Sequence, residues 1–204
     1  MVAGIILAAG ESRRMGRDKA LLPLGRENFL QHLIDLLRGE LSPLVIVLGH
    51  HAPEIERQIV PTSKADQETD SNMIVLRNPN YSLGQLSSLK VGVEYLMSCP
   101  SSGVLVSLVD HPAITKEVVR LLLERFEKAP APILIPVYRG RRGHPVLFAR
   151  PLFQEILDAP LEEGARFVVR RHAAEVDLVD TEEEGILLDV DLPADYERLL
   201  ARWK

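Results

Sequence analysis

The sequence of 204 residues predicts an α/β protein in three layers, with helices on both faces of a mostly parallel, mixed central sheet. Two observations support this prediction. Short apolar segments alternate with longer amphipathic segments along the chain, which is typical of strands and helices in turn. The short segments are apolar throughout, as expected for strands that are covered on both faces. The chain is expected to form a single domain, residues 1–204, because no internal repeat or linker divides it.

The expected strands and helices follow one another along most of the chain. Strands are expected at 2–9, 44–48, 73–76, 104–109, 133–137, 145–149, 176–179 and 186–188. Helices are expected at 28–38, 53–60, 84–97, 116–128, 151–157, 165–172 and 193–203. Residues 139–143 are expected to form the tip of a hairpin, which adds an antiparallel element. The polar segment 61–71 lacks large apolar side chains and is expected to be a mobile surface loop.

The helical segments carry apolar residues at helical spacing. The first helix has Phe29, Leu33, Leu36 and Leu37 on one face, and the third has Leu86, Leu89, Val93 and Leu96. Gly39 is expected to end the first helix, since glycine is common just after a helix. Both helices therefore have one face to bury against the sheet.

Composition and charge exclude several classes of protein. The net charge of −5 argues against a general nucleic-acid binder, which would show a basic face. Cys99 is the only cysteine, and the six histidines show no H-x-x-x-H spacing, so neither a disulfide nor a zinc site is expected. The first apolar run is too short for a membrane span and lacks the basic start of a signal peptide. A cytoplasmic protein without membrane partners is expected.

The loop after the first strand, from Leu7 to Lys19, contains two glycines, three arginines and a lysine. Gly10 and Gly16 are expected to turn the backbone through positive φ and to leave its N–H groups uncovered. Cationic side chains beside such amides suit a polyanion, above all a nucleoside triphosphate. The spacing is neither that of a P-loop nor that of a dinucleotide fingerprint. On spacing alone, a solvated basic loop is the alternative.

Asp110 follows the apolar run 104–109 and precedes His111 and Pro112. In open α/β sheets, ligands bind beyond the carboxyl ends of the strands. A carboxylate at that edge can hold Mg²⁺ together with phosphate oxygens. The alternative is an aspartate that only caps the turn before Pro112.

Three further stretches contain residues suited to binding anions or metals. Gly84, Ser87 and Ser88 begin a helix, whose N-terminus either binds an anion or is simply capped by Gly84 or Ser82. His144 lies between Gly143 and Pro145 and follows the arginines at 139, 141 and 142, which either meet a phosphorylated ligand or are solvated. Asp189 and Asp191 precede the last helix, where Pro193 and Asp195 are typical of a helix start.

The chain resembles the MobA-like NTP transferases in these five stretches, which lie in the family's order from Leu7 to Tyr196. Leu7 to Lys19 reads L-A-A-G-x-S-x-R-M-G-x-x-K, similar to the family's signature loop. Its A-A-G is most similar to that of molybdenum cofactor cytidylyltransferases (MocA-like), since guanylyltransferases usually carry A-G-G. The G-H-P-V-L-F at 143–148 matches the cytidylyltransferase branch letter for letter. Departures from the family pattern are Leu86, His111 and Leu192.

The resemblance implies a Rossmann-like nucleotidyltransferase (GT-A-like) fold. It implies transfer of CMP from CTP to molybdopterin-bound molybdenum, with release of pyrophosphate and formation of a cytosine dinucleotide cofactor. Lys19, Arg14 and Asp110 would be catalytic, and Asp110 and Asp191 would hold Mg²⁺ or Mn²⁺, with Asp189 in reserve. The residues that would bind the nucleotide or the acceptor are Leu7, Ala8, Ala9, Gly10, Ser12, Gly16, Gly84, Ser87, Ser88 and His144.

Two other functions stay open. The first is another small-molecule nucleotidyltransferase, which uses GTP or acts on a sugar phosphate or other phosphate acceptor. The second is a nucleotide- or cofactor-binding protein without catalysis. The expected partners are CTP and a phosphorylated pterin, and a client molybdoenzyme or its chaperone is a further candidate.

Overall fold

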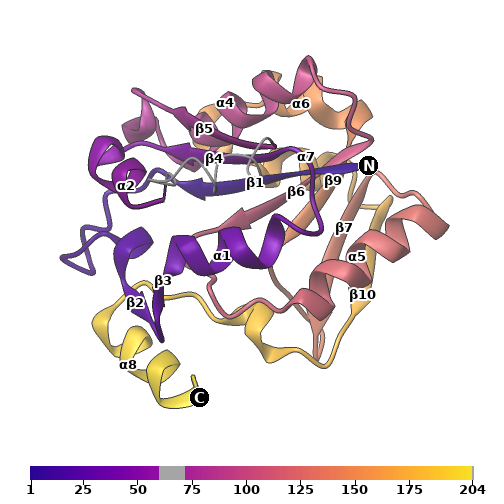
Figure 1. The fold of residues 1–204 in the computed structure, drawn as a ribbon. Coiled ribbons are helices and arrows are strands. Elements are labelled where there is room, and N and C mark those ends of the chain that lie inside the picture. Colours follow the sequence, from indigo (N-terminus) through magenta and orange to yellow (C-terminus); the bar gives the residue numbers. More distant parts are fainter. Residues whose placement is uncertain (60–71, 204) are drawn as a thin grey trace.

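A computed structural model describes residues 1–59 and 72–203, in which helices cover both faces of one main sheet (Figure 1). Its strand order is β10-β7-β9-β6-β1-β4-β5, and β8 pairs with β7. The central strand β1 (Val2–Ala8) is parallel to β6 (Gly103–Leu108) on one side and to β4 (Leu44–Leu48) on the other. β5 (Met73–Arg77) extends this parallel half. The expected loop at 61–71 lies outside the described residues.

The other half of the sheet contains the antiparallel strands. β9 (Val146–Ala149) is antiparallel to both β6 and β7 (Ile133–Tyr138), while β8 (Arg141–Arg142) forms a short hairpin with β7. β10 (Val176–Asp180) runs parallel to β7. The predicted mixed sheet with a late antiparallel element is therefore confirmed.

The helices bury one apolar cluster on each face of the sheet. One cluster lies under α1 (Phe29–Leu37), α2 (Ala52–Ile59), α5 (Lys116–Lys128) and α8 (Pro193–Arg202). The other lies under α4 (Gln85–Met97), α6 (Phe153–Asp158) and α7 (Arg166–Arg171). β1 contributes Ile6 to the first and Ile5 to the second, because successive side chains of a strand point to opposite faces. The predicted three-layer α/β fold is confirmed.

The expected strand at 186–188 is wrong. This stretch is part of a 3-10 helix, η5 (Glu184–Leu187), which crosses the β7–β9 hairpin. The backbone N–H of His144 donates to the Ile186 carbonyl at 3.0 Å. A Cβ on Gly143 would lie 2.5 Å from that carbonyl oxygen, so only glycine permits this approach. Short apolar runs do not distinguish a strand from such a crossing segment.

A second sheet was not expected. β2 (Pro23–Leu24) and β3 (Glu27–Asn28) form a two-stranded hairpin, and Gly25 turns between them with φ +64°. Each of these strands has only two residues, which is too few to give a periodic pattern of apolar residues in the sequence.

Arg150 ties the end of β9 to the C-terminus of α4. Its guanidinium donates to four carbonyl oxygens, those of Cys99 (2.6 Å), Met97 (2.9 Å), Ser101 (3.2 Å) and Leu96 (3.3 Å). Arg150→Met should lower the free energy of unfolding by about 2–3 kcal/mol, because a charged donor is lost and helix-end carbonyls lose their partner. Urea unfolding measures this loss. Arg26→Met, at an exposed arginine, is the control, and equal stability of the two variants would contradict the prediction.

Among the described residues, no helix combines the length and the apolar character needed to cross a membrane.

Candidate active site

The parallel strands β1, β4, β5 and β6 end at the same edge of the sheet, and a pocket of about 480 Å³ opens there. Its walls come from the loop after β1, the start of α4, the end of β6 and the segment before α8. The predicted site residues that line it are Leu7, Ala8, Ala9, Gly10, Ser12, Arg14, Lys19, Gly84, Ser88, Asp110 and Asp191. Gly16, Ser87 and His144 do not line it.

Lys19 lies at the centre of the charged part of this pocket. Its Nζ is 3.0 Å from Oδ2 of Asp110 and 2.5 Å from Oδ1 of Asp191. Burial lowers the pKa of Lys19, but the charges and hydrogen bonds of the two carboxylates outweigh this effect and raise the pKa above its ordinary value. The hydrogen bond from Lys19 lowers the pKa of Asp191. The Lys19 ammonium therefore joins the two carboxylates in one cluster of ion pairs.

Backbone contacts place the two carboxylates side by side. The N–H of Val190 donates to the Asp110 carbonyl at 2.9 Å, so the segment before α8 lies against the end of β6. The Asp195 carboxylate accepts from the N–H groups of Asp191 and Leu192 at 3.1 and 2.7 Å, as expected at the start of a helix. The helix-start role of Asp195 thereby fixes the backbone that carries Asp191.

Asp189 and Arg14 lie beside this cluster, and each is close to a different aspartate in it. Asp189 has a carboxylate oxygen within 4.8 Å of ligand atoms of Asp110 and His111, and burial, then the charge of Asp110, raises its pKa. Arg14 is exposed, and its Nη2 lies 2.7 Å from Oδ2 of Asp191. Both aspartates before α8 are thus close to Asp110, but Lys19 and Arg14 pair with Asp191.

The loop after β1 is shaped by Ser12 and Gly16. Gly16 has φ +70°, as expected, but the expectation of a positive φ at Gly10 is wrong, and Ser12 has a positive φ of +51° instead. The Ser12 hydroxyl accepts from the N–H of Lys19 at 3.0 Å, which holds the loop closed. No atom lies within 4 Å of the place where a Cβ of Gly10 would be, so the backbone there is open to the pocket.

Asn78 organises the start of α4, a role that no pattern in the sequence indicates. This buried amide donates to the hydroxyls of Ser87 and Ser88, each at 2.9 Å. The Ser87 hydroxyl is 2.7 Å from the Gly84 carbonyl, which closes the first turn. Gly84 has φ +99° and precedes the helix, as predicted for its N-terminus. Ser88 and Gly84 face the pocket, whereas Ser87 acts within the helix start.

A second pocket of about 620 Å³ adjoins the first and shares Leu7 and Gln85 with it. It contains His144, which is partly buried, and this desolvation followed by the neighbouring His111 lowers the pKa of His144 to about 4. The imidazole is therefore neutral at neutral pH. The arginines at 139, 141 and 142, on the hairpin tip, line neither pocket.

Several lining residues were not among the site residues predicted from the sequence. Tyr81, Ser82 and Gln85 belong to the first pocket, and residues 161–166 with Val169 and Arg170 belong to the second. Tyr81 and Ser82 follow β5, which ends at the same edge as β1, so their place in the chain was a usable signal. The segment between α6 and α7 carries no motif that would have indicated it.

Comparison with known proteins agrees with this geometry. The family model of the MobA-like NTP transferase domain matches residues 4–176. The molybdenum cofactor cytidylyltransferase of Escherichia coli K12 is 26% identical over 94% of this chain and 92% of its own length. A probable molybdenum cofactor guanylyltransferase of Carboxydothermus hydrogenoformans is 27% identical over 96% of this chain and 93% of its own.

Solved structures show the same fold. The crystal structure of Rv0371c from Mycobacterium tuberculosis H37Rv superposes with a TM-score of 0.82 at 24% identity and covers 98% of both chains. The manganese complex of that protein superposes with a TM-score of 0.71 at 23% identity and covers 98% of this chain and 97% of its own. The family match spans most of the chain and includes Lys19 and Asp110 of the lysine–aspartate cluster, whereas Asp191 lies beyond its end. The chain belongs to the MobA-like NTP transferase family and is a nucleotidyltransferase similar to the molybdenum cofactor cytidylyl- and guanylyltransferases.

Proposed function

We propose that this protein transfers CMP from CTP to molybdopterin carrying molybdenum, releases pyrophosphate and forms the cytosine dinucleotide cofactor. The observation that carries the proposal is the convergence of Lys19, Asp110 and Asp191 in a pocket walled by the glycine loop. These groups come from three distant parts of the chain. An ion-paired cluster inside a cleft is typical of a functional site.

The donor set suits a hard divalent cation. Two carboxylates that already share one cation, the Lys19 ammonium, offer the oxygen ligands that Mg²⁺ and Mn²⁺ prefer. Asp110 and Asp191 would hold the ion, which would neutralise charge on the phosphates of the nucleotide. The manganese complex of the M. tuberculosis protein supports a divalent metal in this fold.

The remaining groups would bind and orient the two substrates. The open backbone at Gly10 and the Arg14 guanidinium would hold the triphosphate, and Lys19 would neutralise charge that develops on it. The acceptor would lie in the second pocket beside His144, next to the nucleotide, because Leu7 and Gln85 belong to both pockets. An acceptor phosphate has a second pKa of about 6 and is largely ionised at neutral pH, so no general base is required.

Cytidine is the proposed base because of Ala9 and the G-H-P-V-L-F run at 143–148. An alanine in place of a second glycine narrows the site beside the loop. GTP is the second candidate, since a guanylyltransferase and a cytidylyltransferase are about equally similar to this chain.

Release of pyrophosphate from CTP, GTP and ATP, with and without the molybdenum-loaded pterin, tests the proposal. Release that needs both CTP and the pterin is the expected result. Release that needs GTP instead of CTP would identify GTP as the donor. Release that needs another phosphate acceptor would show that the pterin is not the acceptor. No release with any nucleotide, together with thermal stabilisation by one of them, would favour a binding protein without catalysis.

A further inference from the structure

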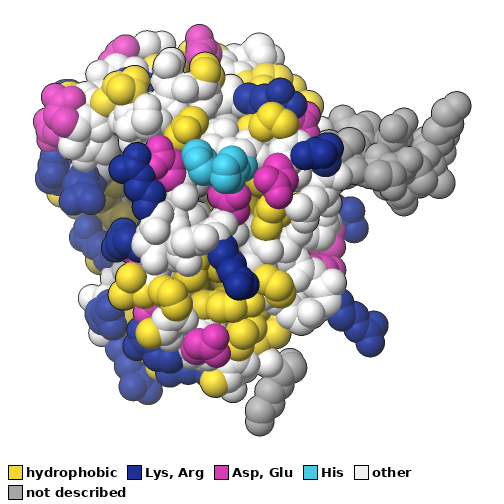
Figure 2. Space-filling view, turned by 90° about the vertical axis from the view of Figure 1, so that its left-hand side faces the viewer, with side chains coloured by type: hydrophobic (Ala, Val, Ile, Leu, Met, Phe, Trp, Pro, Cys, Tyr) yellow, Lys and Arg dark blue, Asp and Glu magenta, His cyan; other side chains and the backbone are white. Residues whose placement is uncertain are grey.

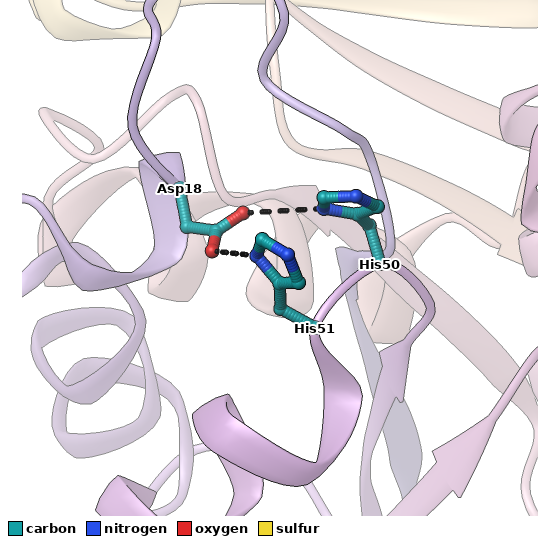
Figure 3. A group of neighbouring side chains, drawn as sticks. All are labelled: Asp18, His50 and His51. Atoms are coloured by element: carbon teal, nitrogen blue, oxygen red, sulfur yellow. Dashed lines mark hydrogen bonds and ion pairs between the residues drawn. The ribbon is translucent and has the colours of Figure 1, made fainter.

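Asp18, His50 and His51 form a second cluster of ligating side chains, which lies beside the first pocket (Figure 3). Oδ2 of Asp18 is 2.6 Å from Nδ1 of His51, and Oδ1 of Asp18 is 3.7 Å from Nδ1 of His50. Asp18 lines the pocket and directly precedes Lys19, yet the two side chains have different partners, since Lys19 contacts Asp110 and Asp191. The cluster is therefore separate from the proposed Mg²⁺ ligands.

The chain holds the two histidines firmly against the loop after β1. The N–H of His50 donates to the Ala9 carbonyl at 3.2 Å. A Cβ on Gly49 would lie 2.6 Å from that same oxygen and 2.6 Å from Cβ of Tyr81, so glycine permits the close approach. His51 adopts φ +50°, which directs its ring back toward Asp18. Both imidazoles are thus positioned by backbone contacts.

One ring nitrogen in this cluster has no hydrogen-bond partner in the described part of the chain. Nδ1 of His50 is buried and has no hydrogen-bond partner among the described residues, although Figure 3 shows it directed at the Asp18 carboxylate. The two imidazole rings lie 3.8 Å apart between their centroids, so both are close to the same carboxylate. On the face seen in Figure 2, histidine side chains reach the surface with acidic side chains directly beside them.

We propose that Asp18, His50 and His51 bind a divalent transition-metal ion of the Zn²⁺ and Co²⁺ type. The ligand atoms of a tetrahedral zinc site lie about 3.3 Å apart, since each Zn–N or Zn–O bond is about 2.0–2.1 Å. The separations of 2.6 and 3.7 Å, which join the two imidazoles to different oxygens of Asp18, lie on either side of that value. One ligand atom of each residue lies within 4.8 Å of the other two. Two imidazole nitrogens favour such a metal over Mg²⁺, which prefers oxygen.

Three protein ligands leave a coordination position for water or for a ligand oxygen, as in catalytic rather than structural zinc sites. Because Asp18 is part of the pocket wall, that position adjoins the pocket. The expectation of no zinc site rested on the spacing of histidines along one helix. Here a loop residue joins two adjacent histidines that lie more than thirty residues later, so that spacing rule does not apply.

Titration of the purified protein with Co²⁺, in the presence of saturating Mg²⁺, tests the site by visible absorption. Mg²⁺ occupies oxygen sites and leaves imidazole ligands free. We expect one equivalent of Co²⁺ with the absorption of a four-coordinate histidine site, and displacement by Zn²⁺. His50→Phe and His51→Asn should each weaken binding at least about a hundredfold, because each removes a ligand. Asparagine at 51 tolerates the positive φ, and thermal unfolding checks that both variants fold.

His172→Asn is the matched control. This histidine also contacts two carboxylates, Glu155 and Glu175, at 2.8 and 2.9 Å, but it lies at the end of α7. Its substitution should leave Co²⁺ binding unchanged. Absence of Co²⁺ binding, or equal binding by the parent protein and both cluster variants, would reduce the cluster to an ion pair between Asp18 and His51. The absorption does not require turnover, so its result is independent of the proposed nucleotidyl transfer.

Discussion

Replacing Lys19 with methionine is expected to lower the rate of nucleotidyl transfer by about a hundredfold to a thousandfold, the usual effect of losing one charge contact to a transition state. The Lys19 ammonium lies between Asp110 and Asp191, and its raised pKa keeps it charged at neutral pH. Methionine retains most of the volume of the buried side chain, so the variant removes the charge with little effect on packing. Single-turnover rates of CMP transfer measure the loss.

The same variant should bind Mn²⁺ more tightly in the absence of nucleotide. Lys19 competes with a metal ion for the carboxylates of Asp110 and Asp191. Without it, the Asp110 carboxylate loses this ion pair and Asp191 keeps only its contact with the exposed Arg14. Lys116→Met is the matched control, since Lys116 is a surface lysine paired with Glu40 at 3.1 Å. It should change neither the rate nor Mn²⁺ binding. A Lys19→Met protein with the parent rate would refute the proposed role of this lysine.

The sequence was sufficient to predict which residues line the pocket at the ends of β1 and β6. Leu7 and Ala8 are the last residues of β1, Ala9 and Gly10 follow it, and Asp110 lies two residues after β6. Because these two strands are adjacent and parallel, the convergence of the residues follows from topology alone. The position of Asp191 was harder to predict from the sequence, because no strand ends directly before it. Its position depends on η5 crossing the hairpin at Gly143 and on the bond from Val190 to Asp110. Such tertiary contacts leave no periodic signal.

Other parts of the site were outside the reach of local patterns for the same reason. Asn78 acts through hydrogen bonds to two serines about ten residues later. The second pocket is completed by the segment between α6 and α7, whose polar residues resemble any surface turn. Asp18 meets His50 and His51 only because β4 is adjacent to β1. The role of Asp191 as a metal ligand was predicted from the resemblance, and the fold explains why its side chain lies beside Lys19.

Asp110→Asn is expected to reduce CMP transfer by a similar factor, about a hundredfold to a thousandfold, and to weaken the apparent affinity for Mg²⁺ or Mn²⁺. The amide keeps the shape of the side chain, and the backbone carbonyl still accepts from Val190, so the fold is retained. A high concentration of metal should restore part of the rate, because the remaining carboxylate of Asp191 still binds the ion. Electron paramagnetic resonance of Mn²⁺ measures the affinity directly.

Asp191→Asn and Asp189→Asn distinguish the two aspartates before α8. Asp191 contacts both Lys19 and Arg14, whereas burial and the charge of Asp110 raise the pKa of Asp189 and disfavour its ionised form. Asp191→Asn should therefore match Asp110→Asn, and Asp189→Asn should stay within about tenfold of the parent rate. The reverse order would assign the metal to Asp110 and Asp189. Full activity of Asp110→Asn would refute a metal site at this edge of the sheet, because both candidate pairs of metal ligands include the Asp110 carboxylate.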